Sequence, residues 1–147
     1  MRISVSRCAA TALFSSALSE ASSFSAPVVT SGLGGIFPAM VNAIQGTAHA
    51  QGASTIAEGI AVGQPGRITR ELVAHLVDDM VLVDEGDIEQ ALVMLLEIEK
   101  TVVEGAGAVT LAALLNDAER FRGKRVVLVL SGGNIDFTVV DRIIRKG

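Results

Sequence analysis

The chain has 147 residues, of which half are apolar and 3% are aromatic, and its formal net charge is −4. This length suits one domain with its own core, and the composition excludes an intrinsically disordered chain. No basic stripe or group of stacking aromatic residues indicates a nucleic-acid partner, and no apolar run reaches the roughly 18 residues that a membrane span requires.

The first part of the chain differs in composition from the rest. Residues 1–30 are rich in Ser and Ala and contain no acidic residue before Glu20, which is typical of both targeting presequences and irregular leaders. We therefore assign residues 1–36 to a divergent, poorly ordered leader or junction and residues 37–147 to the folded part. The lone cysteine, Cys8, excludes an internal disulfide and indicates a reducing compartment, so we expect a cytoplasmic protein.

The elements predicted first are short. Pro38 is suited to open a helix that stops at Gly46, and the glycine-rich residues 46–67 read as a loop. Thr69 is the expected N-cap of the next helix, whose apolar residues recur at helical spacing. The apolar residues 80–83 then predict a strand.

The second half of the chain carries the stronger patterns. Asp84 is expected to cap the longest helix, over about residues 85–103, and a second apolar helix follows over about residues 108–115 after a break at two glycines. Residues 126–130 predict a strand that is apolar on both faces. Thr138 is the expected N-cap of the last helix.

The order of these elements predicts the fold class. Helices that alternate with fully apolar strands are typical of an α/β domain with parallel strands. Only two strands are convincing, however, and two strands with several apolar helices do not close a sheet. We therefore expect part of a larger α/β domain, or a partner of one.

Four residues at three places in the chain are candidates for chemistry. Ser131 follows the last strand, at the end where parallel sheets bind ligands, and Gly132 would let a flat ligand approach the backbone. Glu104 stands at the end of an apolar helix, where we expect partial burial, and Gly59 interrupts an apolar stretch. Each has a structural alternative: a tight turn at residues 131–133, a solvated acid at Glu104 and a bulge at Gly59.

Other kinds of site are not indicated. His49 and His75 lack metal-ligand spacing to each other or to Cys8, so we predict no metal site. Ser131 has no base near it in the sequence, which argues against a hydrolase triad.

Five motifs together resemble one family. Their order and spacing are similar to the carboxyl-terminal part of the catalytic domain of threonine dehydratase (threonine ammonia-lyase), a pyridoxal-phosphate enzyme of the tryptophan-synthase-β fold type. Serine dehydratases and serine racemase are relatives. The motifs are FPAMVNAIQG (37–46), STIAEGIAVGQPGRIT (54–69), ELVAHLVDDMVLVDEGDIEQAL (71–92), EKTVVEGAGAVTLAALL (99–115) and GKRVVLVLSGGNID (123–136).

The resemblance implies a role for each candidate residue. Ser131 would hydrogen-bond the pyridine nitrogen of pyridoxal 5′-phosphate, and a neutral hydroxyl there leaves that nitrogen largely unprotonated. Gly59 would present backbone to the ring edge, Glu104 would lie close to the ring, and Gly132 would line the pocket beside Ser131. The implied reaction removes the α-proton and β-hydroxyl of threonine or serine and gives ammonia and a 2-oxo acid, as in isoleucine biosynthesis.

The sequence also departs from the family pattern. The family lysine that binds the cofactor lies in a Ser-Phe-Lys-x-Arg-Gly-Ala motif, and the three lysines here, Lys100, Lys124 and Lys146, lie outside such a motif. The asparagine that flanks the ring is missing, and only SGLGGI (31–36) resembles the family's glycine-rich phosphate loop.

These departures set the functional expectation. Because covalent catalysis requires that lysine, we assign no catalytic residue to this chain and expect a truncated dehydratase segment that is inactive alone. Its partners would be an amino-acid substrate in the full enzyme and either further copies or a complementing amino-terminal fragment, with neither nucleic acid nor membrane. The alternative is a non-catalytic remnant or a partner-binding fragment.

Overall fold

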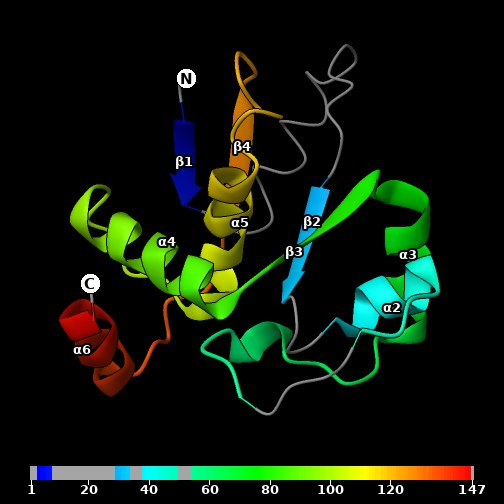
Figure 1. Ribbon diagram of the computed structural model, residues 1–147, viewed down its shortest axis with the longest axis horizontal. Helices are drawn as coiled ribbons and strands as arrows, with labels where there is room; N and C mark the ends of the chain where they lie inside the picture. The colour runs from blue at the N-terminus through cyan, green and yellow to red at the C-terminus, as the bar shows by residue number, and fades with distance from the viewer. Residues whose placement is uncertain (1–2, 8–28, 34–37, 50–53, 147) are drawn as a thin grey trace.

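The computed structural model describes residues 3–7, 29–33, 38–49 and 54–146. These residues form both helices and strands (Figure 1). In chain order they are β1 (Ile3–Arg7), β2 (Val29–Leu33), α2 (Ala39–Gln45), the 3-10 turn η1 (Glu58–Ile60), α3 (Arg67–Leu76), β3 (Asp79–Val83), α4 (Glu85–Glu97), α5 (Gly105–Asn116), β4 (Val126–Leu130) and α6 (Phe137–Lys146). Cys8 and most of the predicted leader lie outside the described residues.

The described strands form two parallel pairs. β1 pairs with β4, with Ile3 opposite Val126, and β2 pairs with β3, with Val29 opposite Asp79. Parallel strands joined through helices confirm the predicted α/β class. The two predicted strands, β3 and β4, are present, whereas β1 and β2 were not predicted and fall within residues 1–36.

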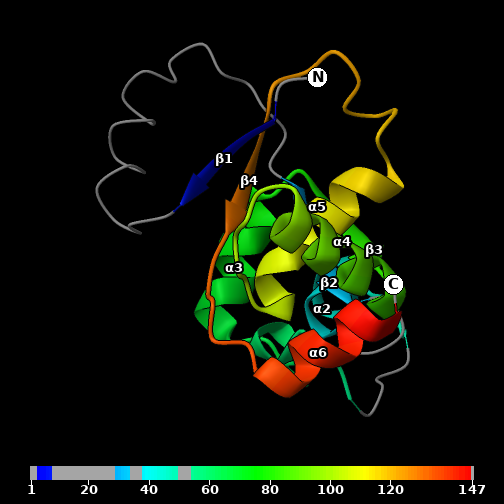
Figure 2. The ribbon, with the colours of Figure 1, turned by 90° about the vertical axis from the view of Figure 1, so that its left-hand side faces the viewer.

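Helix α5 forms the centre of the core. It lies against α4 and β4 and also reaches β2, β3 and η1, as two perpendicular views show (Figures 1 and 2). A helix covered on several sides must be apolar nearly all round, and α5 has this composition. Its buried residues are Gly105, Gly107, Ala108, Val109, Leu111, Ala112 and Leu114.

Helix α4 is shorter than the sequence predicts. Asp84 caps it as expected and forms a capping box with Asp87, whose Oδ2 accepts the Asp84 N–H at 3.1 Å. The helix ends at Glu97 rather than near residue 103, because Lys100 adopts a left-handed φ of +53°. The Thr101 N–H then reaches back to the Leu95 carbonyl at 3.1 Å.

Three helix starts also differ from prediction. α5 begins at Gly105, so the two glycines expected to break the helical pattern lie in its first turn. α3 begins after Gly66, which places Thr69 inside the helix instead of at its cap. α6 is capped by Asp136, whose Oδ1 accepts the N–H and the hydroxyl of Thr138 at 2.8 Å each. These bonds, the backbone one first, lower the pKa of Asp136.

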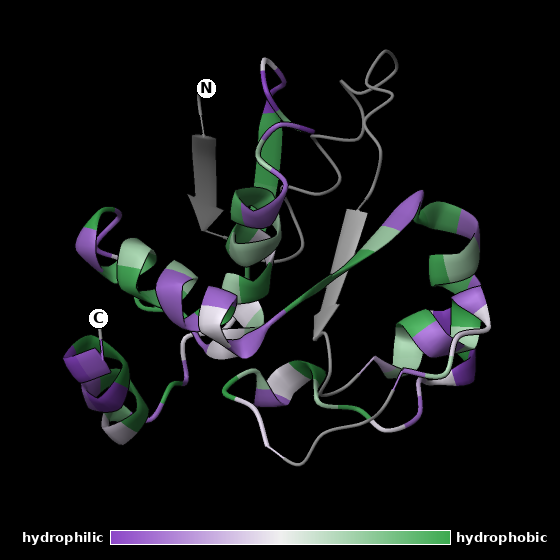
Figure 3. Ribbon diagram, in the orientation of Figure 1, coloured by the Kyte–Doolittle hydropathy of each residue, from purple (hydrophilic) through white to green (hydrophobic). Residues whose placement is uncertain are grey.

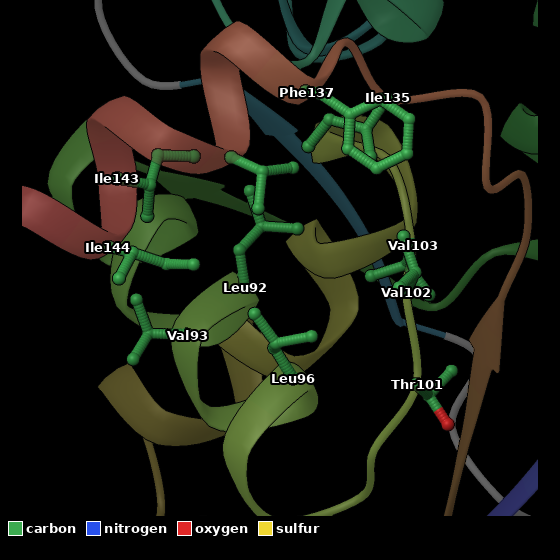
Figure 4. Close-up of a pocket in the computed structure, with 11 residues that line it drawn as sticks. Leu92, Val93, Leu96, Thr101, Val102, Val103, Ile135, Phe137, Ile143 and Ile144 are labelled. Atoms are coloured by element: carbon green, nitrogen blue, oxygen red, sulfur yellow. The ribbon is translucent and has the colours of Figure 1, made fainter.

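Helix α6 is two-sided. One side is hydrophilic and the other hydrophobic (Figure 3), and Ile143 is buried while Phe137 is 85% exposed. Its hydrophobic side faces α4 across an apolar hollow of about 160 Å³ (Figure 4). The lining residues are Leu92, Val93, Leu96, Thr101, Val102, Val103, Ile135, Phe137, Val140, Ile143 and Ile144. No helix in the described part of the chain is long and apolar enough to cross a membrane.

Candidate active site

Three of the four predicted site residues meet at the start of α5. Glu104 is the N-cap residue of α5 and is partly buried, as predicted. A Cβ added to Gly132 would lie 2.6 Å from either carboxylate oxygen of Glu104, and one added to Gly59 would lie 3.2 Å from its Oε1. Residues 59, 104 and 132, which are far apart in the sequence, therefore meet around one carboxylate.

Ser131 stands next to this group. The backbone carbonyl of Ser131 packs on Gly107, where an added Cβ would lie 3.3 Å from the Ser131 carbonyl carbon and closer still to its oxygen. The Ser131 residue is exposed and follows the buried Leu130 at the end of β4. The strand thus delivers the serine to the carboxyl end of the sheet, the end at which parallel sheets bind ligands.

The glycines at the start of α5 allow this assembly. A Cβ on Gly105 would lie 2.9 Å from the Ala57 nitrogen and collide with the Ile56 carbonyl. Because Gly105 has no side chain, the loop that carries Gly59 can pack directly against it. The end of β4 packs against Gly107 for the same reason. The sequence analysis missed both roles, although a glycine pair inside an otherwise apolar helix was the available signal.

The structural alternatives can now be compared with the geometry. Gly132 has a left-handed φ of +75°, but residues 131–136 form neither a turn nor a bend. Gly59 lies in the 3-10 turn η1. Neither finding conflicts with a ligand-facing role, because both glycines also meet the carboxylate of Glu104.

A cavity of about 590 Å³ opens beside this cluster. Gly59 and Glu104 are among its lining residues, whereas Ser131 and Gly132 are not. The described lining is Ser54, Thr55, Ile56, Glu58, Gly59, Glu85, Glu104, Gly105, Ala106, Asn134, Ile135, Asp136, Val139 and Arg142. Four carboxylates thus share this lining with one guanidinium, that of Arg142, and the sequence analysis had singled out only one of these four acids.

Lysine is absent from this described lining. Lys100 Nζ donates to the Glu97 carbonyl at 2.5 Å, and Lys146 Nζ pairs with Glu89 at 2.5 Å. Lys124 is exposed in the turn before β4. Among the described residues, no group of three His, Cys, Asp or Glu side chains is arranged to hold a metal ion.

The arrangement was compared with known proteins. Residues 21–132, well over half of the chain, match the sequence profile of the family described as pyridoxal-phosphate dependent enzymes. The chain belongs to this family. The resemblance predicted from the motifs is thereby confirmed, and the cofactor of the family is pyridoxal phosphate.

Several curated relatives in this family are similar over the same part of the chain. L-threonine ammonia-lyase of Thermotoga maritima is 54% identical over 97 residues, covering 66% of this chain and 24% of the relative. L-threonine dehydratase catabolic TdcB of Escherichia coli K12 is 43% identical over 91 residues, covering 60% of this chain and 28% of the relative. The chain thus spans about a quarter of the length of the curated relatives that it matches.

Solved structures of the family share the fold. A T.th. threonine deaminase superposes with a TM-score of 0.67 at 30% identity, covering 80% of this chain and 43% of the other. Maize serine racemase superposes with a TM-score of 0.68 at 29% identity, covering 87% of this chain and 41% of the other. The expected partial domain of the tryptophan-synthase-β fold type is therefore confirmed.

The residues at the start of α5 fit one part of pyridoxal phosphate. A cavity of about 590 Å³ adjoins Gly59 and Glu104, and Ser131 stands at the carboxyl end of β4, whereas the space beside Gly132 is taken by the Glu104 carboxylate. Covalent attachment needs an amine, and none of the lysines lines the cavity. The described lining of this cavity thus provides no lysine amine for attachment.

Proposed function

We propose that this chain forms the ring-contacting part of a pyridoxal-phosphate-dependent ammonia-lyase that acts on threonine or serine. The observation that carries the proposal is the convergence of Gly59 and Gly132 on the carboxylate of Glu104 at the start of α5. The names of the relatives, L-threonine ammonia-lyase and L-threonine dehydratase, support threonine as the substrate.

Each residue has a distinct task in this proposal. When bound, pyridoxal phosphate supplies an electron sink for the substrate's α-carbon. The Ser131 hydroxyl hydrogen-bonds the ring nitrogen without adding charge. Gly59 and Gly132 present backbone to the ring, and Glu104 lies close to it. The deamination product would be 2-oxobutanoate from threonine.

In this proposal the anchoring amine lies outside these 147 residues. Because the lysines of this chain point to other partners or to solvent, we infer that turnover requires a complementing amino-terminal segment, and that the chain alone binds the cofactor without turning over threonine. Assembly with that segment or with further copies, and a cytoplasmic location, belong to the same proposal.

The test measures 2-oxobutanoate released from threonine by the chain, alone and mixed with an amino-terminal fragment of the Thermotoga maritima relative. We expect product only from the mixture. S131A and E104Q should lower its rate, whereas E97Q, an exposed acid at the end of α4, should not. A mixture without product, together with no binding of pyridoxal phosphate to the chain in equilibrium dialysis, would refute the proposal and leave the non-catalytic remnant.

A further inference from the structure

Glu85, the first residue of α4, is bonded to the loop that carries Gly59. Its Oε2 accepts the Thr55 hydroxyl at 2.8 Å, and its Oε1 accepts the Ile56 N–H at 2.6 Å. Both carboxylate oxygens are thus engaged by two consecutive loop residues. Hydrogen bonds to an ionised acceptor are shorter and stronger than neutral ones, so this contact can fix the loop.

Further hydrogen bonds extend from Thr55 into the loop. The Thr55 hydroxyl also accepts the Ala57 N–H at 2.9 Å, and Ala57 is completely buried. The Ile60 N–H then donates to the Ala57 carbonyl at 3.0 Å and forms η1, in which Gly59 lies. A continuous chain of hydrogen bonds therefore leads from the Glu85 carboxylate to the turn that contains Gly59.

The platform that carries Glu85 is itself fixed. The capping box of Asp84 and Asp87 holds the first turn of α4. Asn116, the last residue of α5, donates to Asp87 Oδ2 at 2.7 Å. The start of α4 is therefore tied to the far end of the helix whose beginning carries Glu104.

From this geometry we propose that Glu85 and Thr55 form a clamp that positions Gly59 against Glu104 for contact with the cofactor ring. Glu85 and Thr55 are positioning residues in this scheme, because they act through residues 56–59. The inference rests on the proposed function, since the clamp serves a ring bound beside Gly59.

Amide hydrogen exchange on the full chain tests the clamp without any ligand. E85A removes the acceptor of the Ile56 N–H, and T55V removes the acceptor of the Ala57 N–H while keeping the side-chain shape. We expect exchange at the affected amide to accelerate about tenfold or more, with the α5 amides unchanged. T55S keeps the hydroxyl and should behave as the unchanged chain, and so should E97A, which removes an exposed acid from the other end of α4.

Equilibrium dialysis with pyridoxal 5′-phosphate then tests whether the clamp supports binding of the cofactor. We expect T55V to weaken binding by about tenfold, the effect of one lost interaction of about 1.4 kcal/mol, and T55S to restore it. Unchanged exchange in both E85A and T55V would overturn the clamp. Faster exchange with unchanged binding would overturn its link to the cofactor.

Two further outcomes are also decisive. If the unaltered chain binds no pyridoxal phosphate, the proposed function fails for this chain, and exchange at residues 56 and 57 still decides whether the clamp exists. Faster exchange of the α5 amides in E85A would show that this variant unfolds the whole chain. Comparison of exchange in T55V and T55S then decides whether the clamp exists.

Discussion

At the scale of single residues, Gly132 and Gly123 offer a controlled comparison. Both have a φ of +75°, but an added Cβ meets nothing within 4 Å at Gly123 and meets the Glu104 carboxylate at Gly132. A left-handed conformation costs an L-residue about 1–2 kcal/mol. An alanine at either position would therefore carry the same backbone cost, and only the alanine at position 132 would also contact Glu104.

We predict that G132A and G123A lower the free energy of unfolding by similar amounts, about 1–2 kcal/mol each. The carboxylate is the end of a flexible side chain and can rotate away, so the collision adds little to the cost. G132A alone should displace Glu104. Urea denaturation measures the first effect, and the NMR shift of the Glu104 carboxyl carbon measures the second. A Glu104 shift of equal size in G123A would show that Gly132 and Glu104 are not in contact.

At the scale of elements, the opening of α5 depends on Gly107. An added Cβ there meets the Ser131 backbone, which cannot rotate away as a side chain can. Gly86 in α4 is the matched position, because an added Cβ meets nothing within 4 Å. In an unobstructed helix, alanine is more stable than glycine by roughly 0.5–1 kcal/mol.

We predict opposite signs for the two alanine substitutions. G86A should raise the free energy of unfolding by roughly 0.5–1 kcal/mol, whereas G107A should lower it by about 1–3 kcal/mol, the usual cost of overpacking. Urea denaturation of both variants checks the signs. A stabilising G107A would mean that β4 and α5 separate freely, and the placement of Ser131 would lose its support.

The element boundaries also show what the sequence could and could not predict. The apolar patterns predicted α4, α5, β3 and β4 correctly as elements, because periodicity reports which face is buried. The end of α4 was wrong because Lys100, a non-glycine residue, takes the left-handed conformation that ends the helix. The start of α5 was wrong because its glycines look like helix breakers and instead admit neighbouring backbone. β1 and β2 were missed because their sequences, ISVSR and VTSGL, lack the unbroken apolar run that marks β4.

Some residues of the candidate site could be predicted from the sequence and others could not. Gly59, Glu104 and Gly132 were singled out by pattern and resemblance, and the structure brings them together. Glu85 and Arg142 line the adjoining cavity, and neither was singled out as a site residue, although Glu85 lies within the motif of residues 71–92. Their position follows from how α4 and α6 pack around the start of α5, which single-sequence patterns do not specify.

At the scale of the whole molecule, one ion pair joins distant parts of the fold. Arg120, between α5 and β4, pairs with Asp79 at the start of β3 at 2.5 Å. The Arg120 hydrogen bond, followed by that of the Met80 N–H, lowers the pKa of Asp79 below its ordinary value of 3.8. The folded state therefore favours the ionised carboxylate more than the unfolded state does.

The sign of the pH dependence follows from this lowered pKa. Above pH 3.8 the Asp79 carboxylate is ionised in both states, and its full contribution to stability is present. As the pH falls through the lowered folded pKa, the unfolded chain has already bound its proton, and the contribution is lost. The Asp79 side chain is 40% exposed, so solvent screening limits the contribution to about 0.5–1 kcal/mol.

We therefore predict that D79N lowers the free energy of unfolding at pH 7 by about 0.5–1 kcal/mol, and that its difference from the unaltered chain shrinks in acid below pH 3.8. Urea denaturation across this range measures both. E119Q is the control, because the Glu119–Arg122 pair joins residues of a single turn and is exposed, so its loss should not move the unfolding midpoint measurably. A D79N effect of constant size down to about pH 2 would show that the side-chain charge plays no part.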